Sequence, residues 1–268
     1  MKRSLLTLLI AVIFCPAAKA QGCDTSQVLL TLRGGAGLGV YRDMGASPIT
    51  YRGLEIHPGI GVLVEQPQWR YEALFEVGGG AYGYRPWPDY WHCYGGQAAL
   101  SFEMLRRVAS AGQRGLQLWL GASVDERFDL RYNGNLGNAC TGTSNFIRIN
   151  AIGRAEYRLE RWQFWGRLEL NPVALLLRPG YAYIDNYDRD IARVAANLFD
   201  QHHWYLAGGT GLGTEVGAQL TLANGNRLGL SYRWRYLNSR ATADGVTAPF
   251  RFEQAEHALL FNLSFNLR

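Results

Sequence analysis

Apolar and polar side chains alternate along most of the chain with a period of two. The clearest case is the segment 146–177, which consists of two alternating runs joined at Glu160 and Arg161. A period of two is typical of a β-strand, because successive side chains in a strand point to opposite faces. The two runs therefore predict a hairpin with one apolar face and one charged face.

Pairing the two runs back from the turn places Leu159 opposite Trp162 and Arg154 opposite Arg167. Apolar side chains then face apolar side chains, and charges face charges. The predicted apolar face carries Ile147, Ile149, Ala151, Gly153, Ala155, Tyr157, Leu159, Trp162, Phe164, Gly166, Leu168, Leu170, Ala174 and Leu176.

These runs are too long for the strands of an ordinary soluble β-sandwich, which have about five or six residues. A strand that crosses a bilayer needs about 9 to 11 residues, with an apolar outer face and a polar inner face. The pattern therefore predicts an all-β fold, an antiparallel up-and-down transmembrane β-barrel with its charges turned inward.

The same alternation divides the rest of the chain into ten strands. They are residues 27–42, 51–64, 69–84, 94–105, 116–132, 146–159, 162–177, 204–222, 227–237 and 253–268. The connections after the even-numbered strands are mostly short, and those after the odd-numbered strands are mostly long. One short turn contains Gly225, which we expect to supply a positive φ. An even strand number with this alternation predicts that both termini lie at the short-turn end.

Aromatic side chains gather near both ends of the predicted strands, as they do at the two interfaces of a membrane barrel. Those expected on the outer face near the short turns are Trp69, Tyr71, Tyr157 and Trp162. Those expected near the long connections are Tyr132, Trp204, Trp234 and Tyr236.

The first 20 residues have the form of a secretory signal peptide, with a basic start, an apolar stretch at 5–14 and small residues before Gln21. A lipoprotein signal that ends at Cys23 is the weaker reading, because the residues before that cysteine match its cleavage site poorly. The mature protein is then one barrel domain, 21–268.

Removal of the signal lowers the formal net charge from +5 to +2, because Lys2, Arg3 and Lys19 leave with it. Every basic residue that remains is an arginine. Arginine stays charged when buried and forms paired hydrogen bonds to carboxylates. The composition therefore indicates an interior of ion pairs and gives no basis for binding nucleic acid.

Together, the signal peptide, the ten two-faced strands and the alternating last strand resemble small bacterial outer-membrane β-barrel proteins of omptin size, or a Bacteroidota-type barrel of unassigned function. The resemblance implies a Gram-negative outer membrane with both termini periplasmic. Its implied partners are outer-membrane lipid, lipopolysaccharide and the barrel-assembly machinery. Many such chains end on an aromatic residue, whereas here Phe265 and Leu267 precede a final Arg268.

Inward-facing charges form the main candidate site. A structural plug of ion pairs is one interpretation, and a permeation path or buried binding site is the other. If it is a plug, we expect Glu156, Glu169 and a carboxylate such as Glu72 or Glu76 to pair with the facing arginines. The predicted lumen network is Glu55, His57, Glu72, Glu76, Arg148, Arg154, Glu156, Arg167, Glu169, Arg233 and Arg235.

The glycine runs 35–39 and 209–213 superficially resemble a nucleotide-binding loop, but neither opens a predicted helix. We interpret them as glycines that let strands bend and leave room for large lumen side chains. Cys93 and Cys140 both fall near the long-connection end, so a disulfide between them is one possibility in an oxidising compartment. No motif predicts a cofactor or a metal site.

Two classes of barrel enzyme can be compared with the sequence. A barrel lipid hydrolase needs a His-x-Ser pair, and none of the five histidines has serine two residues later. An omptin-like protease needs Asp and His at the outer rim, where Asp188, Asp190, His202 and His203 are candidates. The sequence favours a non-enzymatic porin-like barrel, either a narrow pore or a scaffold for external loops, with the rim protease as the alternative.

Overall fold

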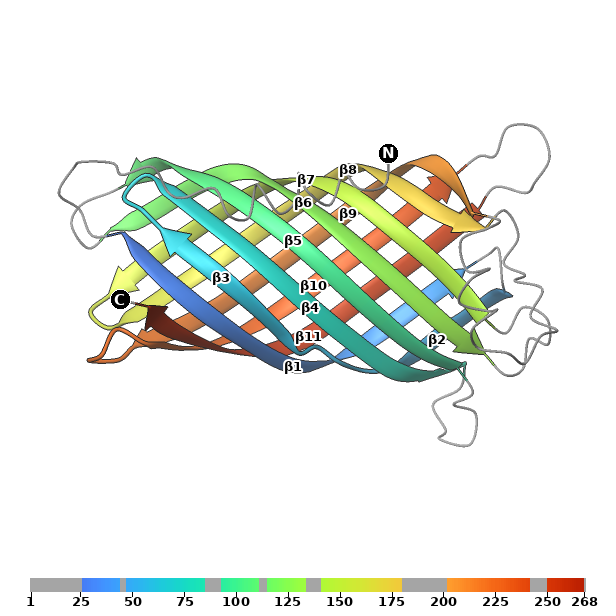
Figure 1. Cartoon of the computed structure of the whole chain (residues 1–268), viewed down its shortest axis with the longest axis horizontal. Coiled ribbons are helices and arrows are strands. Elements are labelled where there is room, and N and C mark those ends of the chain that lie inside the picture. Colours follow the sequence, from blue (N-terminus) through green and yellow to red (C-terminus); the bar gives the residue numbers. More distant parts are fainter. Residues whose placement is uncertain are drawn as a thin grey trace.

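The computed structural model describes residues 26–43, 47–84, 93–110, 115–133, 141–179, 202–241 and 250–267. They form a closed antiparallel β-barrel whose strands are tilted to its long axis (Figure 1). Within these ranges the structure contains no helix long and apolar enough to cross a membrane. The predicted signal peptide, residues 1–20, lies outside the described residues.

Ten strands make up the wall, as the alternation predicts, because β2 and β3 together form one of them. Both pair with β1 on one side and with β4 on the other. The strands are β1 (Gln27–Asp43), β2 (Ser47–Ile56), β3 (Gly59–Glu65), β4 (Trp69–Gly83), β5 (Cys93–Ser110), β6 (Leu116–Asn133), β7 (Thr141–Leu159), β8 (Trp162–Pro179), β9 (His202–Thr221), β10 (Arg227–Ala241) and β11 (Phe250–Leu267).

The break between β2 and β3 falls at Pro58, inside the single strand predicted over 51–64. Proline has no backbone N–H, so it cannot donate to the ladder. The register nevertheless continues through the break, since Ile56 pairs with Ala36 and Gly59 pairs with Arg33. Inward and outward faces are therefore the same on both sides of the proline.

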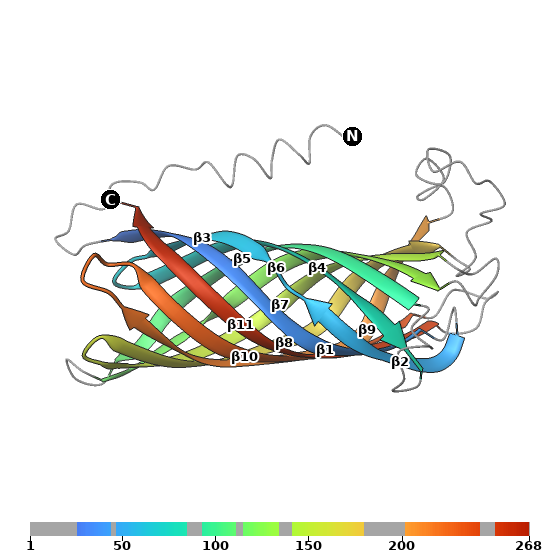
Figure 2. The ribbon, with the colours of Figure 1, turned by 90° about the horizontal axis from the view of Figure 1, so that it is seen from below.

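The barrel closes where β1 pairs with β11, from Val28 opposite Leu267 to Asp43 opposite Phe252 (Figure 2). Both ends of the described chain lie at the same end as the short connections (Figure 1). We call this the turn end. The other end, where the strands flanking 180–201 terminate, is the loop end.

The outer surface of the wall is apolar, and the side chains there are exposed. Leu38, Ile56 and Leu259 are 57, 61 and 56% exposed, and Ile149 is 58% exposed. An apolar surface of this extent is unfavourable in water and suits hydrocarbon. The inner face is mainly polar and charged, so the predicted alternation holds for most of every strand.

The alternation reverses in β8, and this corrects the prediction for Ala174 and Leu176. Both were expected on the outer face, but they are 3 and 1% exposed and face the lumen, whereas Leu175 is 36% exposed. The cause is a register shift between Asn171 and Val173, where β8 has one more residue than β7. An extra residue in one strand exchanges its two faces beyond that point.

The two predicted turns have the expected geometry. Leu159 pairs with Trp162, and Arg154 pairs with Arg167. Gly225 has φ of +81°, a left-handed conformation that glycine adopts without steric cost.

Outer aromatic residues stack near both ends of the barrel. Trp69 stacks on Tyr71 and Trp162 on Phe164 near the turn end, with ring centroids 6.2 and 6.3 Å apart. From the middle of β10 toward the loop end Trp234 stacks on Tyr236 at 6.4 Å, and near the loop end Tyr132 is 49% exposed. The side chain of Trp204 lies outside what the structure describes.

The outer face yields a prediction for Val124, in the middle of β6, which is 50% exposed. In lipid, Val124→Arg should lower the free energy of unfolding by about 2 to 4 kcal/mol, because an arginine at the bilayer midplane loses its hydration. The matched control is Leu116→Arg, on the same face at the first residue of β6 and 44% exposed. Its expected cost is about 0 to 1 kcal/mol. Urea unfolding in vesicles measures both, and equal losses would contradict the membrane placement.

Candidate functional site

The predicted lumen residues all lie on the inner face of the wall. Eight of them are less than 9% exposed: Glu55, His57, Glu76, Arg148, Arg154, Glu156, Glu169 and Arg233. The side chains of Arg167, Glu72 and Arg235 are 14, 18 and 27% exposed. The strands thus bring these residues into one interior, where they form ion pairs at successive depths.

Near the turn end, carboxylates and guanidinium groups alternate across the lumen. Arg154 donates to Glu156 over 2.6 Å, and Arg70 donates to the same carboxylate over 3.2 Å. Arg70 also bonds Glu65 at 2.7 Å, and Glu65 accepts from Arg227 at 2.7 Å. This chain of charge-assisted bonds connects β7, β4, β3 and β10, strands that are mostly not neighbours in the wall.

Arg167 pairs with Glu169, as predicted, but its second partner differs from the prediction. It donates to Glu169 on its own strand over 2.7 Å and to Glu103 on β5 over 2.9 to 3.0 Å. Glu103 therefore takes the position proposed for Glu72 or Glu76. The reason is that Glu103 reaches Arg167 across the lumen. Distances across the lumen cannot be deduced from the local sequence pattern.

In the middle of the barrel, Arg233 holds two carboxylates together and is only 1% exposed. Its two terminal nitrogens bind the two oxygens of Glu76 at 2.8 and 2.9 Å, and it also contacts Glu256 at 2.7 to 2.9 Å. Arg33 and Arg235 lie 4.0 and 3.9 Å from Glu76. Bidentate pairing of this kind offsets much of the desolvation cost of a buried guanidinium.

Further pairs extend the network toward the loop end. Arg148 donates to Asp125 over 2.6 Å. Arg127 bonds Asp129 at 3.0 to 3.1 Å and Gln254 at 2.9 Å. The buried charges therefore span most of the length of the lumen.

At the loop end an aromatic layer lies across the lumen. Arg131 is placed between the ring of Tyr41, at 4.2 Å, and the ring of Phe252, at 4.5 Å. These two cation–π contacts join two apolar clusters, because each ring belongs to a different one. The clusters are Tyr41, Tyr51, Tyr82 and Cys93, and Phe146, Ala174, Leu176, Leu237 and Phe252.

Two cavities lined by described residues between these layers are small. One has a volume of about 80 Å³ and lies among Arg33, Arg70, Glu72 and Arg235, and another has about 20 Å³. Binding sites for drug-sized ligands have about 300 to 1,000 Å³. The cavity among the arginines has room for only a few water molecules.

The remaining predicted positions lie at the loop end. Cys93 is the first residue of β5 rather than a loop residue. It is buried, its thiol contacts the Tyr41 hydroxyl, and it forms no disulfide with a described residue. Cys140 lies outside the described residues, so its disulfide with Cys93 stays a prediction. His202 and His203 begin β9 and pair in register with Pro179 and Arg178, and their side chains are not described. Asp188 and Asp190 lie outside the described residues.

Several lumen residues were missing from the predicted network. The alternation itself places them on the inner face, so the signal was present. They are Glu65, Arg70, Glu103, Asp125, Arg127, Asp129, Glu215, Arg227 and Glu256. One of them, Glu256, belongs with Glu55 and His57 to a group whose oxygen and nitrogen atoms are close enough to hold a metal ion.

No protein-family model and no curated protein sequence matches the chain. Solved structures similar to it include the outer membrane protease OmpT from Escherichia coli, with 10% identity over 90% of this chain and 96% of that chain and a TM-score of 0.47. The translocator domain of the autotransporter NalP from Neisseria meningitidis has 9% identity over 98 and 97% and a TM-score of 0.40. Neisserial surface protein A has 10% identity over 90 and 100% and a TM-score of 0.34.

The fold is that of a small outer-membrane β-barrel. This assignment rests on the closed ten-stranded wall, the apolar exterior and the charged interior. The solved structures at these identities add nothing about activity.

The central network yields a second prediction. Arg233→Met should lower the free energy of unfolding by about 3 to 5 kcal/mol, because it leaves Glu76 and Glu256 buried without their guanidinium partner. Arg161→Met, in the exposed turn between β7 and β8, is the matched control and should change it little. Urea titration followed by the heat-dependent gel mobility of the barrel measures both. Equal stability of the two variants would show that the network is not structural.

Proposed function

We propose that the protein is a non-enzymatic outer-membrane barrel that acts as a scaffold for the long connections at its loop end. The observation that supports this most is the filled lumen. Ion pairs and aromatic side chains occupy the lumen from the turn end to the loop end. The cavity among the lumen arginines has a volume of only about 80 Å³.

The exterior supports a location in the outer membrane. Chains that cross a bilayer as strands do so as closed barrels, because an open edge would leave backbone groups unpaired in hydrocarbon. The pairing of β1 with β11 removes that edge. By the usual topology of such barrels, short turns and both termini would lie in the periplasm and the loop end outside the cell.

A narrow pore is less consistent with these side chains. Ten strands lie close to the eight that side chains fill completely and far from the sixteen or more of open porins. An ion passing through would have to displace Arg131 from between two rings and separate Arg233 from Glu76. Both steps expose charges that the lumen cannot hydrate.

We predict that the purified barrel gives no steady conductance in planar bilayers, since these layers lie in series along the lumen. An open porin reconstituted in the same lipid is the positive control. Stable single-channel steps that depend on protein concentration would contradict the closed lumen and favour the pore.

The orientation can be tested in intact cells. An epitope inserted within 180–201 should bind antibody on unbroken cells, whereas the same epitope after Arg268 should bind only after the outer membrane is opened. Labelling of the C-terminal epitope on intact cells, or recovery of the protein in the soluble periplasmic fraction, would contradict the proposal. Fractionation of the same cells checks that both tagged proteins reach the membrane.

The competing class is the rim protease. It predicts peptide cleavage by the purified wild type that is lost in Asp190→Ala and in His203→Ala. Cleavage with that dependence would replace the scaffold proposal, and an unchanged peptide profile supports it.

A further inference from the structure

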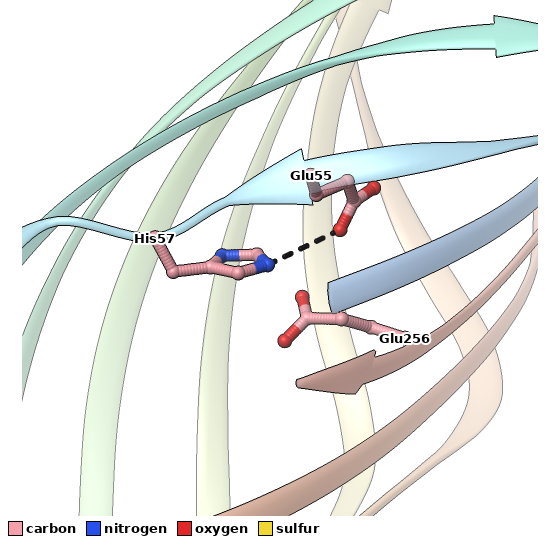
Figure 3. A group of neighbouring side chains, drawn as sticks. All are labelled: Glu55, His57 and Glu256. Atoms are coloured by element: carbon pink, nitrogen blue, oxygen red, sulfur yellow. Dashed lines mark ion pairs between the residues drawn. The ribbon is translucent and has the colours of Figure 1, made fainter. Parts of the chain in front are cut away.

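We propose that Glu55, His57 and Glu256 form a binding site for a divalent transition-metal ion, with Zn²⁺ as the representative ion (Figure 3). The three side chains are 3, 0 and 1% exposed and lie in the middle of the lumen. Figure 3 shows the imidazole and both carboxylates directed toward one another. The site does not depend on whether the barrel is a scaffold or a pore.

The spacing of the three groups fits a metal ion. His57 Nε2 lies 3.4 Å from Glu55 Oε2, and one ligand atom from each of the three residues lies within 4.8 Å of the others. In a tetrahedral zinc site with bonds of about 2.0 to 2.2 Å, neighbouring ligand atoms are about 3.4 Å apart. A small rotation of the Glu256 carboxylate would complete three ligands, which leaves the fourth position for water.

The atoms that point into the site have no hydrogen-bond partner. They are Glu55 Oε2, His57 Nε2 and Glu256 Oε2. Leaving one buried polar atom unsatisfied costs about 1 to 3 kcal/mol, and more for a charged group. Three such atoms converging on one point indicate that a cation shared by all three belongs there.

Glu55 has a particular need for a cation. Its other oxygen accepts a hydrogen bond from the Tyr82 hydroxyl. No ion pair between described residues joins Glu55 to an arginine, whereas Glu256 and Glu76 share Arg233. The carboxylate of Glu55 thus has no arginine within ion-pair distance among the described residues, and Arg127 acts on it only from farther away.

The surroundings of His57 leave Nε2 available as a ligand. Its other nitrogen, Nδ1, lies 3.8 Å from Glu76 and 3.4 Å from the Gln97 amide. When a metal ion binds Nε2, Nδ1 carries the proton of the ring, and the Glu76 carboxylate can accept it in a hydrogen bond. The same arrangement of carboxylate, histidine and metal supports the ligands of many zinc sites.

A protonated imidazole is the alternative occupant, and it fits the distances less well. One N–H can point straight at only one of the two carboxylates. Charge-assisted N–H···O bonds are about 2.7 to 2.9 Å long, whereas the Nε2 to Oε2 distance is 3.4 Å. A metal ion satisfies both carboxylates at once.

Glycine on β1 makes the room for this site. Glu55 on β2 and Glu256 on β11 pair with Gly37 and Gly39 of the strand between them. A Cβ at Gly39 would lie 2.0 Å from Glu55 Oε1. The ligands therefore meet over the one stretch of β1, from Gly35 to Gly39, that has no inward side chains, and the bound ion would connect β2 to β11 across the closing strand.

The test is the metal content and stability of the tag-free mature barrel, refolded with Zn²⁺ and then dialysed against metal-free buffer. We expect the wild type to retain about one zinc per chain. Zn²⁺ should raise its melting temperature, and Mg²⁺ at the same concentration should not, because ligand bound only to the folded state stabilises it. His57→Gln should lose both effects.

His257→Gln is the matched control, since His257 lies next to Glu256 but faces outward and bonds Tyr232 at 2.5 Å. It should keep the zinc and the thermal shift. The proposal is overturned if the wild type holds no more zinc than His57→Gln, or if Zn²⁺ does not change its melting temperature. A protonated imidazole would then occupy the site. If His57→Gln does not fold, Co²⁺-refolded wild type decides, because visible d–d absorption supports the site and its absence overturns it.

Discussion

Most arginines that face the lumen lie within 4.0 Å of a carboxylate, and much of the interior follows from that pairing. A ten-stranded barrel holds too little water to hydrate a guanidinium group, so an unpaired one would cost several kcal/mol. Part of the pairing is local, because residues two apart in a strand share a face. The same-strand pairs are Arg127 with Asp129, Arg154 with Glu156, and Arg167 with Glu169. The charges of these pairs therefore balance within a single strand, without a partner from a distant strand.

The sequence predicts the wall well because alternation and turn register are local properties. Arg154 faces Arg167 as the turn at Glu160 requires, and the inner face follows from counting by twos. The counting fails where a residue is added. This happens after Asn171, where the prediction for Leu176 is wrong, and again at Val108 in β5, beyond the strand that was predicted there. A proline can break hydrogen bonds without changing the faces, as Pro58 does, so proline alone does not mark such a shift.

The partners inside the lumen were less predictable, because they depend on the diameter of the closed barrel. Glu103 reaches Arg167 from β5, three strands away around the wall. Alternation shows that both face inward but not how far each reaches. Glu256 was overlooked for another reason, since its neighbours across the wall are set by the contact of the first strand with the last. That pairing is the most distant in sequence and needs the closed barrel to define it.

The closing strand leaves room in the lumen at its middle. Gly35, Gly37 and Gly39 leave its inner face bare between Arg33 and Tyr41, so large side chains from both neighbours meet above it. Glu55 and Glu256 can then share a cation only when β1 is paired with both β2 and β11. A cation that binds only the closed barrel stabilises the closed barrel by mass action, and it does so without an additional hydrogen bond in the wall. The glycines that weaken the strand on its own thus permit a contact that holds its two neighbours together.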